Sequence, residues 1–185
     1  HEIIVQKGIT YGSAFNNQTK KTQTLTLDAY FPPESDKRTA RPAAVLVHGG
    51  SFETGSSTSD DEPVLAQNLV TRGYVAVSIN YRLTGIHYGL ESTQPAIDAT
   101  EDAKAAVRYV RKMAKEWKID TSRVLMAGDS AGAITSLYAG YAKCASGEGQ
   151  SGNPGFNSSI QAAVSVSGEL KVEAFCKRID PKTLK

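Results

Sequence analysis

The sequence predicts an α/β fold, a mostly parallel β-sheet flanked by helices, with antiparallel strands at its N-terminal edge. Four short runs rich in β-branched residues, 43–47, 74–79, 123–127 and 160–166, are separated by segments with helical periodicity. Before them, residues 24–31 alternate apolar and polar side chains, which is typical of an antiparallel strand with one solvated face. We expect the 185 residues to form a single domain, 1–185.

Two strands are predicted in the N-terminal part, at residues 2–6 and 24–31, and Pro32 and Pro33 end the second. Its alternation places Leu25, Leu27 and Ala29 on the core face and Thr24, Thr26 and Asp28 on the solvent face.

Three helices are predicted between the parallel strands. The first begins at Pro63 after two aspartates, carries Leu65 and Leu69 on its apolar face and ends before Gly73. The second has an apolar stripe over residues 103–117, with acidic residues early and basic residues late, as the helix dipole favours. The third runs from Ser130 to about residue 147 with a stripe of Ile134, Leu137, Tyr138 and Tyr141, and a surface loop over residues 144–159 follows it.

Composition and charge exclude several functions. The 21 basic and 19 acidic residues are mixed along the chain, so no basic stripe is available for nucleic acid. No apolar run approaches the roughly 20 residues that a transmembrane helix needs. Cys144, Cys176 and the three histidines lack metal-ligand spacing, so no metal site is expected.

Three features of the sequence favour a secreted product. The chain begins at His1 without a methionine, and acceptor sequons for N-glycosylation begin at Asn17 and Asn157 in polar segments. Cys144 and Cys176 could form a disulfide in an oxidising compartment, whereas two separate buried thiols are the alternative.

Gly128-Asp129-Ser130-Ala131-Gly132 fits the pattern G-x-S-x-G between a strand and a helix. A turn this tight strains the serine backbone, and the flanking glycines remove Cβ atoms that would clash. Ser130 is therefore predicted to be a nucleophile exposed at the carboxyl edge of the sheet. A serine that only caps the helix is the alternative.

His48-Gly49-Gly50-Ser51-Phe52 directly follows the first parallel strand and supplies a second signal. Acyl transfer builds negative charge on a carbonyl oxygen, which backbone N–H groups of Gly49, Gly50 and Ala131 could stabilise as an oxyanion hole. A plain glycine turn is the alternative.

These two motifs, with Asn80-Tyr81-Arg82-Leu83 and the helix that bears Asp102, resemble the α/β-hydrolase superfamily, and more narrowly its hormone-sensitive-lipase and carboxylesterase groups. The resemblance covers residues 24 to 170. It implies hydrolysis of a carboxylic ester through an acyl-enzyme on Ser130, without a metal or organic cofactor. It also implies that His48 supports the oxyanion loop rather than acting as the base, and that Tyr81 and Arg82 brace that loop.

The sequence after Ser130 offers no catalytic base for the serine. A serine hydroxyl needs a general base, and in this fold the order is serine, acid, histidine. No histidine follows Ser130. The resemblance implies two further strands carrying the acid and the histidine, so we expect an incomplete domain with an exposed sheet edge, open to a complementing C-terminal polypeptide or to self-association. His87, with Glu91 or Asp98, is a weaker candidate for the base.

Three functions therefore remain open. The first is an ester hydrolase of the esterase or lipase type whose acid and histidine lie outside this chain, which alone is expected to be inactive. The second is a noncatalytic binding protein on a hydrolase fold, and the third is an amidase or formamidase with the same nucleophile. The intact serine and glycines favour the first.

Overall fold

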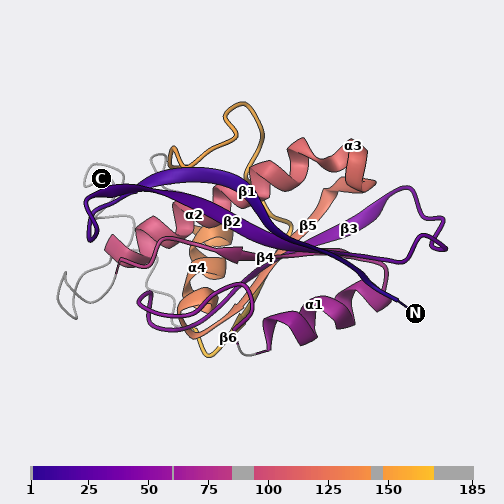
Figure 1. Ribbon diagram of the computed structural model, residues 1–185, viewed down its shortest axis with the longest axis horizontal. Helices are drawn as coiled ribbons and strands as arrows, with labels where there is room; N and C mark the ends of the chain where they lie inside the picture. The colour runs from indigo at the N-terminus through magenta and orange to yellow at the C-terminus, as the bar shows by residue number, and fades with distance from the viewer. Residues whose placement is uncertain (1, 60, 85–93, 143–147, 169–185) are drawn as a thin grey trace.

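The computed structural model describes residues 2–59, 61–84, 94–142 and 148–168, which form one six-stranded sheet in the order β1-β2-β4-β3-β5-β6 (Figure 1). The strands are β1 (Ile4–Asn16), β2 (Lys21–Phe31), β3 (Arg41–Val47), β4 (Val75–Asn80), β5 (Ile119–Asp129) and β6 (Ala162–Val166). The helices are α1 (Glu62–Thr71), α2 (Gln94–Lys112), α3 (Ala114–Trp117) and α4 (Ser130–Tyr141).

Strand directions confirm the predicted α/β class. β1 pairs with β2, and β2 with β4, in antiparallel fashion, whereas β3 is parallel to β4 and β5, and β5 is parallel to β6. The carboxyl ends of β3, β4 and β5 therefore meet at one edge of the sheet, where ligands bind in α/β proteins. His48 follows the end of β3, Tyr81 follows the end of β4 and Ser130 follows the end of β5.

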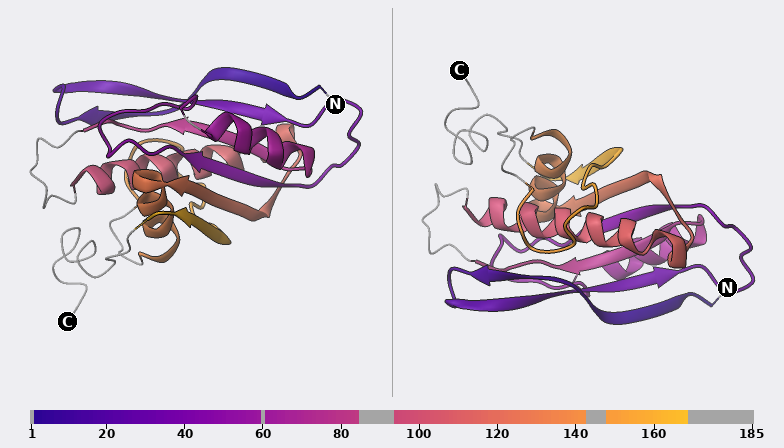
Figure 2. Two further views of the ribbon diagram at one scale, coloured as in Figure 1. Left: turned by 90° about the horizontal axis from the view of Figure 1, so that it is seen from below. Right: turned by 90° about the horizontal axis from the view of Figure 1, so that it is seen from above.

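Helices cover both faces of the sheet, α1 on one side and α2 with α3 on the other (Figure 1). Ala66 and Val70 of α1 pack with Leu46 of β3, whereas Val107 of α2 packs with Val45 of the same strand. This alternation along β3 buries both faces, as the continuous apolar run predicts. Figure 2 shows α4 beside β5 and β6.

The predicted helix faces were partly wrong. In α1 the buried residues are Glu62, Ala66 and Val70, while Leu65 is 40% exposed, because the helix presents the neighbouring i, i+4 row to the sheet. In α4 Tyr141 is 56% exposed, since small residues such as Ala133 and Ser136 form the buried side and let the helix approach the sheet closely.

The N-terminal strands also differ from expectation. β1 extends to Asn16, ten residues beyond the predicted end, because register shifts on either side of Ile9 interrupt its alternation. Asp28 is 4% exposed instead of facing solvent, since the segment after the His48 motif folds over it.

The two glycosylation sequons lie on the surface of the described structure. Asn17 lies exposed in the β1–β2 turn, and Asn157 is exposed in the segment before β6. Cys144 and Cys176 lie outside the described residues. Within the described ranges no helix has both the length and the apolar character needed to cross a membrane.

Candidate active site

Ser130 stands at the sharp turn where β5 ends and α4 begins. Its φ is 46°, in the left-handed region that is uncommon for a residue with a side chain, and the residue is exposed. Asp129, the residue that precedes the helix, makes no side-chain capping hydrogen bond. The first-turn N–H groups of α4, including that of Ala131, have no acceptor within the helix.

The two motifs are in direct contact. A Cβ at Gly132 would lie 1.8 Å from the carbonyl oxygen of Val47 and 2.9 Å from that of His48. On the other side, a Cβ at Gly49 would lie 2.5 Å from Oδ2 of Asp129. Glycine is therefore required at both positions, and the start of α4 lies against the segment that follows β3.

We call residues 48–55 the glycine loop. Gly50, Ser51, Phe52 and Gly55 all have positive φ values, of 102°, 55°, 62° and 100°. The N–H groups of Glu53 and Thr54 both donate to the Gly50 carbonyl, at 2.9 and 3.1 Å, which closes a tight turn. Sequence reasoning anticipated the glycines but missed the two left-handed residues Ser51 and Phe52, for which the residue types give no signal.

The backbone N–H groups of Gly49 and Gly50 lie at the start of the glycine loop, just after the end of β3. Among the hydrogen bonds formed by described residues, none is donated by the backbone N–H of Gly49 or Gly50. The N–H groups of Gly49, Gly50 and Ala131 are those that the sequence predicts for the oxyanion hole. The structure brings Gly49, Gly50 and Ala131 to the same edge as Ser130.

His48 and Tyr81 form the floor beneath the glycine loop. His48 is 1% exposed, its Nδ1 donates to the Gly49 carbonyl at 2.7 Å, and its ring stacks on Tyr81 with centroids 4.3 Å apart. The Tyr81 hydroxyl donates to the carbonyls of His48 and Gly49, at 3.0 and 3.2 Å. Burial, followed by the charges of Asp129 and Glu62, raises the pKa of Tyr81, so its hydroxyl stays a donor.

The resemblance implies that Arg82 braces the glycine loop, but the hydrogen bonds of Arg82 go to α2 and to the end of β1. Its Nε donates to Asp102 at 2.9 Å, its Nη2 donates to the Asp98 carbonyl at 3.1 Å, and its Nη1 donates to the Phe15 carbonyl at 3.1 Å. Burial alone would lower the pKa of Arg82, but the Asp102 hydrogen bond and carboxylate raise it. Arg82 therefore ties α2 to the β1–β2 hairpin.

Asp129 is the remaining charged group at the elbow. It is half-buried, and its Oδ1 is buried without a hydrogen-bond partner among the described residues. No cluster of three or more histidine, cysteine or acidic side chains able to hold a metal ion occurs within the described ranges.

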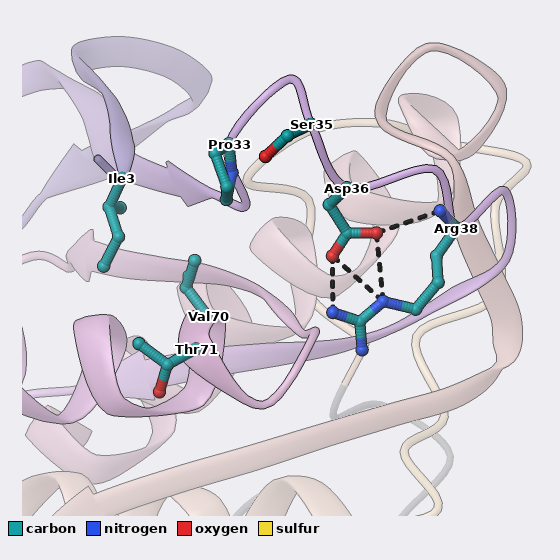
Figure 3. A pocket seen from close by; sticks show the side chains of 7 residues that line it. All are labelled: Ile3, Pro33, Ser35, Asp36, Arg38, Val70 and Thr71. Carbon is teal, nitrogen blue, oxygen red and sulfur yellow. Dashed lines mark hydrogen bonds and ion pairs between the residues drawn. The ribbon is translucent and has the colours of Figure 1, made fainter. Parts of the chain in front are cut away.

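The pocket in Figure 3 lies at the other end of the sheet. Its volume is about 320 Å³, and an ion pair between Asp36 and Arg38 borders it, beside Val70 and Thr71 at the end of α1 (Figure 3). The first parallel strand begins beside this pocket, at Arg41, whereas Ser130 follows the carboxyl end of β5. This pocket therefore lies away from Ser130, and we assign it no part in the reaction.

Histidines that could serve as a base lie outside the described residues. These are His1 and His87, whereas the third histidine, His48, is buried under the glycine loop. The site described here thus holds a serine and hydrogen-bond donors, and the described residues give it no exposed imidazole.

The sheet order and the helices on both of its faces give this chain the fold of the α/β-hydrolase superfamily. The sequence profile of the BD-FAE family matches residues 27–184, and the chain therefore belongs to that family. This confirms the superfamily resemblance.

Relatives and solved structures agree with this assignment. The chain is 34% identical to esterase LipI of Mycobacterium tuberculosis, over 56% of this chain and 30% of the relative, and 38% identical to mouse carboxylesterase 3B, over 62% and 20%. Thermogutta terrifontis esterase 2 phosphoramylated by tabun shares the fold, with a TM-score of 0.70 and 23% identity over 96% of this chain and 61% of that one. The chain spans less than a third of those curated relatives.

Proposed function

We propose that this chain supplies the nucleophile and oxyanion hole of a carboxylic ester hydrolase. Ser130 Oγ gives its proton to the general base as it attacks the ester carbonyl, and the protonated base then gives that proton to the leaving alkoxide, which departs as an alcohol. Water then releases the acid from the acyl-enzyme. Negative charge on the carbonyl oxygen is stabilised by N–H groups of Gly49, Gly50 and Ala131.

One observation carries this proposal: the elbow and the glycine loop are packed against each other through Gly132 and Gly49. A serine that merely capped α4 would need neither the left-handed backbone at Ser130 nor a glycine whose Cβ would overlap the Val47 carbonyl. The arrangement suits a reaction in which the nucleophile and the N–H donors must lie about 3 Å from one carbonyl group.

The acid and the histidine would come from polypeptide outside this chain, packed on the β6 side of the sheet. Val164 and Val166 of β6 are 46% and 57% exposed and lie in register with Ala127 and Asp129 of β5. Ala127 packs with residues of α1, so these valines extend the same face of the sheet. An apolar face of this kind on β6, the last strand of the sheet among the described residues, suits a further strand and helix, whether from the same polypeptide or a second one.

Labelling with a fluorophosphonate tests the proposal. Ser130 should be labelled in a longer product of the gene that contains a downstream acid and histidine, and Ser130→Ala should abolish both labelling and ester turnover. This chain alone should be labelled at least about 10³-fold more slowly, because the proposal takes the base from polypeptide outside it. A longer product that neither labels at Ser130 nor turns over esters would favour the noncatalytic binding protein.

The amidase alternative is separated by matched substrates. An ester and an anilide with the same acyl group should be hydrolysed at rates that favour the ester. A preference for the anilide would favour an amidase or formamidase with the same nucleophile.

We also propose that the protein is secreted, with N-glycans on Asn17 and Asn157 and a disulfide between Cys144 and Cys176. The exposed positions of Asn17 and Asn157 support glycosylation of both. Expression through a secretory pathway should give a mass that falls on enzymatic removal of N-glycans, and a mass without reducing agent that shows whether Cys144 and Cys176 are bridged.

A further inference from the structure

The glycine loop is held in an unfavourable backbone conformation and must be fixed at more than one point. Ser51 and Phe52 are consecutive non-glycine residues with positive φ, each costing about 1 kcal/mol or more. Such a conformation persists only when surrounding contacts specify it. The contacts of Tyr81 fix the beginning of the loop, at the carbonyls of His48 and Gly49.

A second set of contacts fixes the other end, through Asn80, the residue next to Tyr81. The backbone N–H of Ser57 donates to Oδ1 of Asn80 at 2.7 Å, and Nδ2 of Asn80 donates to Oγ of Ser57 at 3.2 Å. The Ser57 hydroxyl then donates to Oδ2 of Asp28 at 3.0 Å. Ser57 and Asp28 are each 4% exposed.

This group is in turn held by the antiparallel strands. Oδ1 of Asp28 accepts a hydrogen bond from the N–H of Gly8 at 2.9 Å, at a β-bulge of β1. Nδ2 of Asn80 also donates to Oγ1 of Thr26 at 3.0 Å, and the Asn80 carbonyl accepts from the Tyr11 hydroxyl at 3.1 Å. Buried groups that are satisfied in this way have one well-defined arrangement.

We propose that Asp28, Ser57 and Asn80, which we call the Asn80 clamp, are positioning residues for the oxyanion hole. Asn80 and Tyr81 are adjacent at the end of β4, so one short segment holds both ends of the glycine loop. The N–H of Thr84 donates to the Phe52 carbonyl at 3.1 Å and gives a third attachment. The clamp acts on the reaction only through the N–H groups of Gly49 and Gly50, and this role rests on the proposed function.

Hydrogen exchange in this 185-residue chain tests the clamp without any enzymatic activity. In Ser57→Ala, peptides covering residues 49–56 should exchange at least about tenfold faster, as expected from loss of about 1.4 kcal/mol of local stability. Peptides from β3 and α2 should be unchanged. Thr58→Ala is the matched control, because Thr58 is exposed and its hydroxyl contacts only the neighbouring Ser56 among the described residues. Unchanged exchange at residues 49–56, or equal acceleration everywhere, would overturn the proposal.

Kinetics of the longer gene product test the consequence for the reaction. Ser57→Ala should lower kcat by about tenfold or more with KM changed less than about twofold, because misplaced donors weaken transition-state binding. Ser57→Thr, which keeps the hydroxyl, should recover most of kcat, and Thr58→Ala should behave as wild type. An unchanged kcat in Ser57→Ala would overturn the positioning role. Absence of ester turnover in the wild-type product would refute the proposed function, while hydrogen exchange would still decide whether the clamp orders the loop.

Discussion

The Cα of Gly132 in α4 lies directly against the carbonyl of Val47 at the end of β3, with room for a hydrogen but not for a methyl group. This contact joins the turn that carries Ser130 to the segment that carries the proposed oxyanion donors, Gly49 and Gly50. The two motifs begin 80 residues apart in the chain, at His48 and Gly128, yet the parallel sheet brings them together because β3 and β5 are neighbours.

Gly132→Ala should be severely destabilising. A Cβ would lie 1.8 Å from the Val47 oxygen, so backbone must move, at a cost of about 3 kcal/mol or more in the free energy of unfolding. Urea denaturation followed by circular dichroism measures this. Gly140→Ala in the same helix is the control, with a nearest contact of 3.3 Å to a side chain, and it should change stability by less than about 1 kcal/mol. Equal effects of the two variants would contradict the account.

Tyr81→Phe should lower stability by about 1 to 2 kcal/mol, because the carbonyls of His48 and Gly49 lose a buried donor. The ring contact with His48 is kept. The same denaturation measurement applies, and a variant as stable as wild type would show that the hydroxyl does not hold the glycine loop.

Tyr81 also predicts a pH dependence. Its folded pKa is raised above the unfolded value of about 10, so the folded state keeps a proton that the unfolded state loses. Its contribution to stability is therefore present below pH 10 and declines as pH rises beyond it, by up to about 1.4 kcal/mol per pH unit. Tyr81→Phe should reduce this alkaline slope, and an identical slope would refute the assignment. Tyr11, whose pKa is also raised by burial, keeps part of the slope in the variant.

Asp102→Ala should cost about 3 kcal/mol or more, because it removes the closest carboxylate from the buried Arg82. Asp102 is 0% exposed and also accepts from the Ser151 hydroxyl at 2.6 Å. Ser151→Ala removes only that bond and should cost less. The two free energies of unfolding, measured side by side, check the order, which the account requires to be Asp102→Ala above Ser151→Ala.

Glu148 predicts sensitivity to acid in the segment before β6. Partial burial alone would raise its pKa, but the Ser158 hydroxyl and the charges of Lys104 and Arg108 lower it. Because the folded pKa is depressed, the stabilisation is present above the unfolded pKa of about 4.3 and is lost as pH falls through the folded value. Glu148→Gln should lose up to about 1 kcal/mol at pH 7, a small value because Glu148 is exposed, and should lose less on acidification than wild type. Thermal melts from pH 7 to pH 3 would reveal parallel curves if this is wrong.

The sequence predicts the sheet and the elbow well because both have local causes. β-branched runs and glycines at fixed offsets define β3, β5 and the turn at Ser130 within a few residues. The Asn80 clamp could not be predicted, because it joins three segments through polar side chains whose types are common in loops. Asp28 illustrates this: its alternation with Leu27 places it toward solvent, and only the fold of residues 56–59 buries it.

The contacts of Arg82 illustrate the same limit. The sequence places Asp102 early in its helix as a partner of the dipole, whereas α2 begins at Gln94 and Asp102 lies in the middle, facing Arg82. The first turn of α2 carries no acidic residue, so the dipole pattern by itself does not mark this boundary, and the buried ion pair emerges only from the packed structure.

Mass-spectrometric mapping of a fluorophosphonate adduct on a longer gene product tests the central claim most directly. The account predicts one adduct, on Ser130, formed at least about 10³-fold faster than on this chain alone and absent from Ser130→Ala. An adduct on another serine, or no adduct on a longer product that contains a downstream acid and histidine, would contradict it.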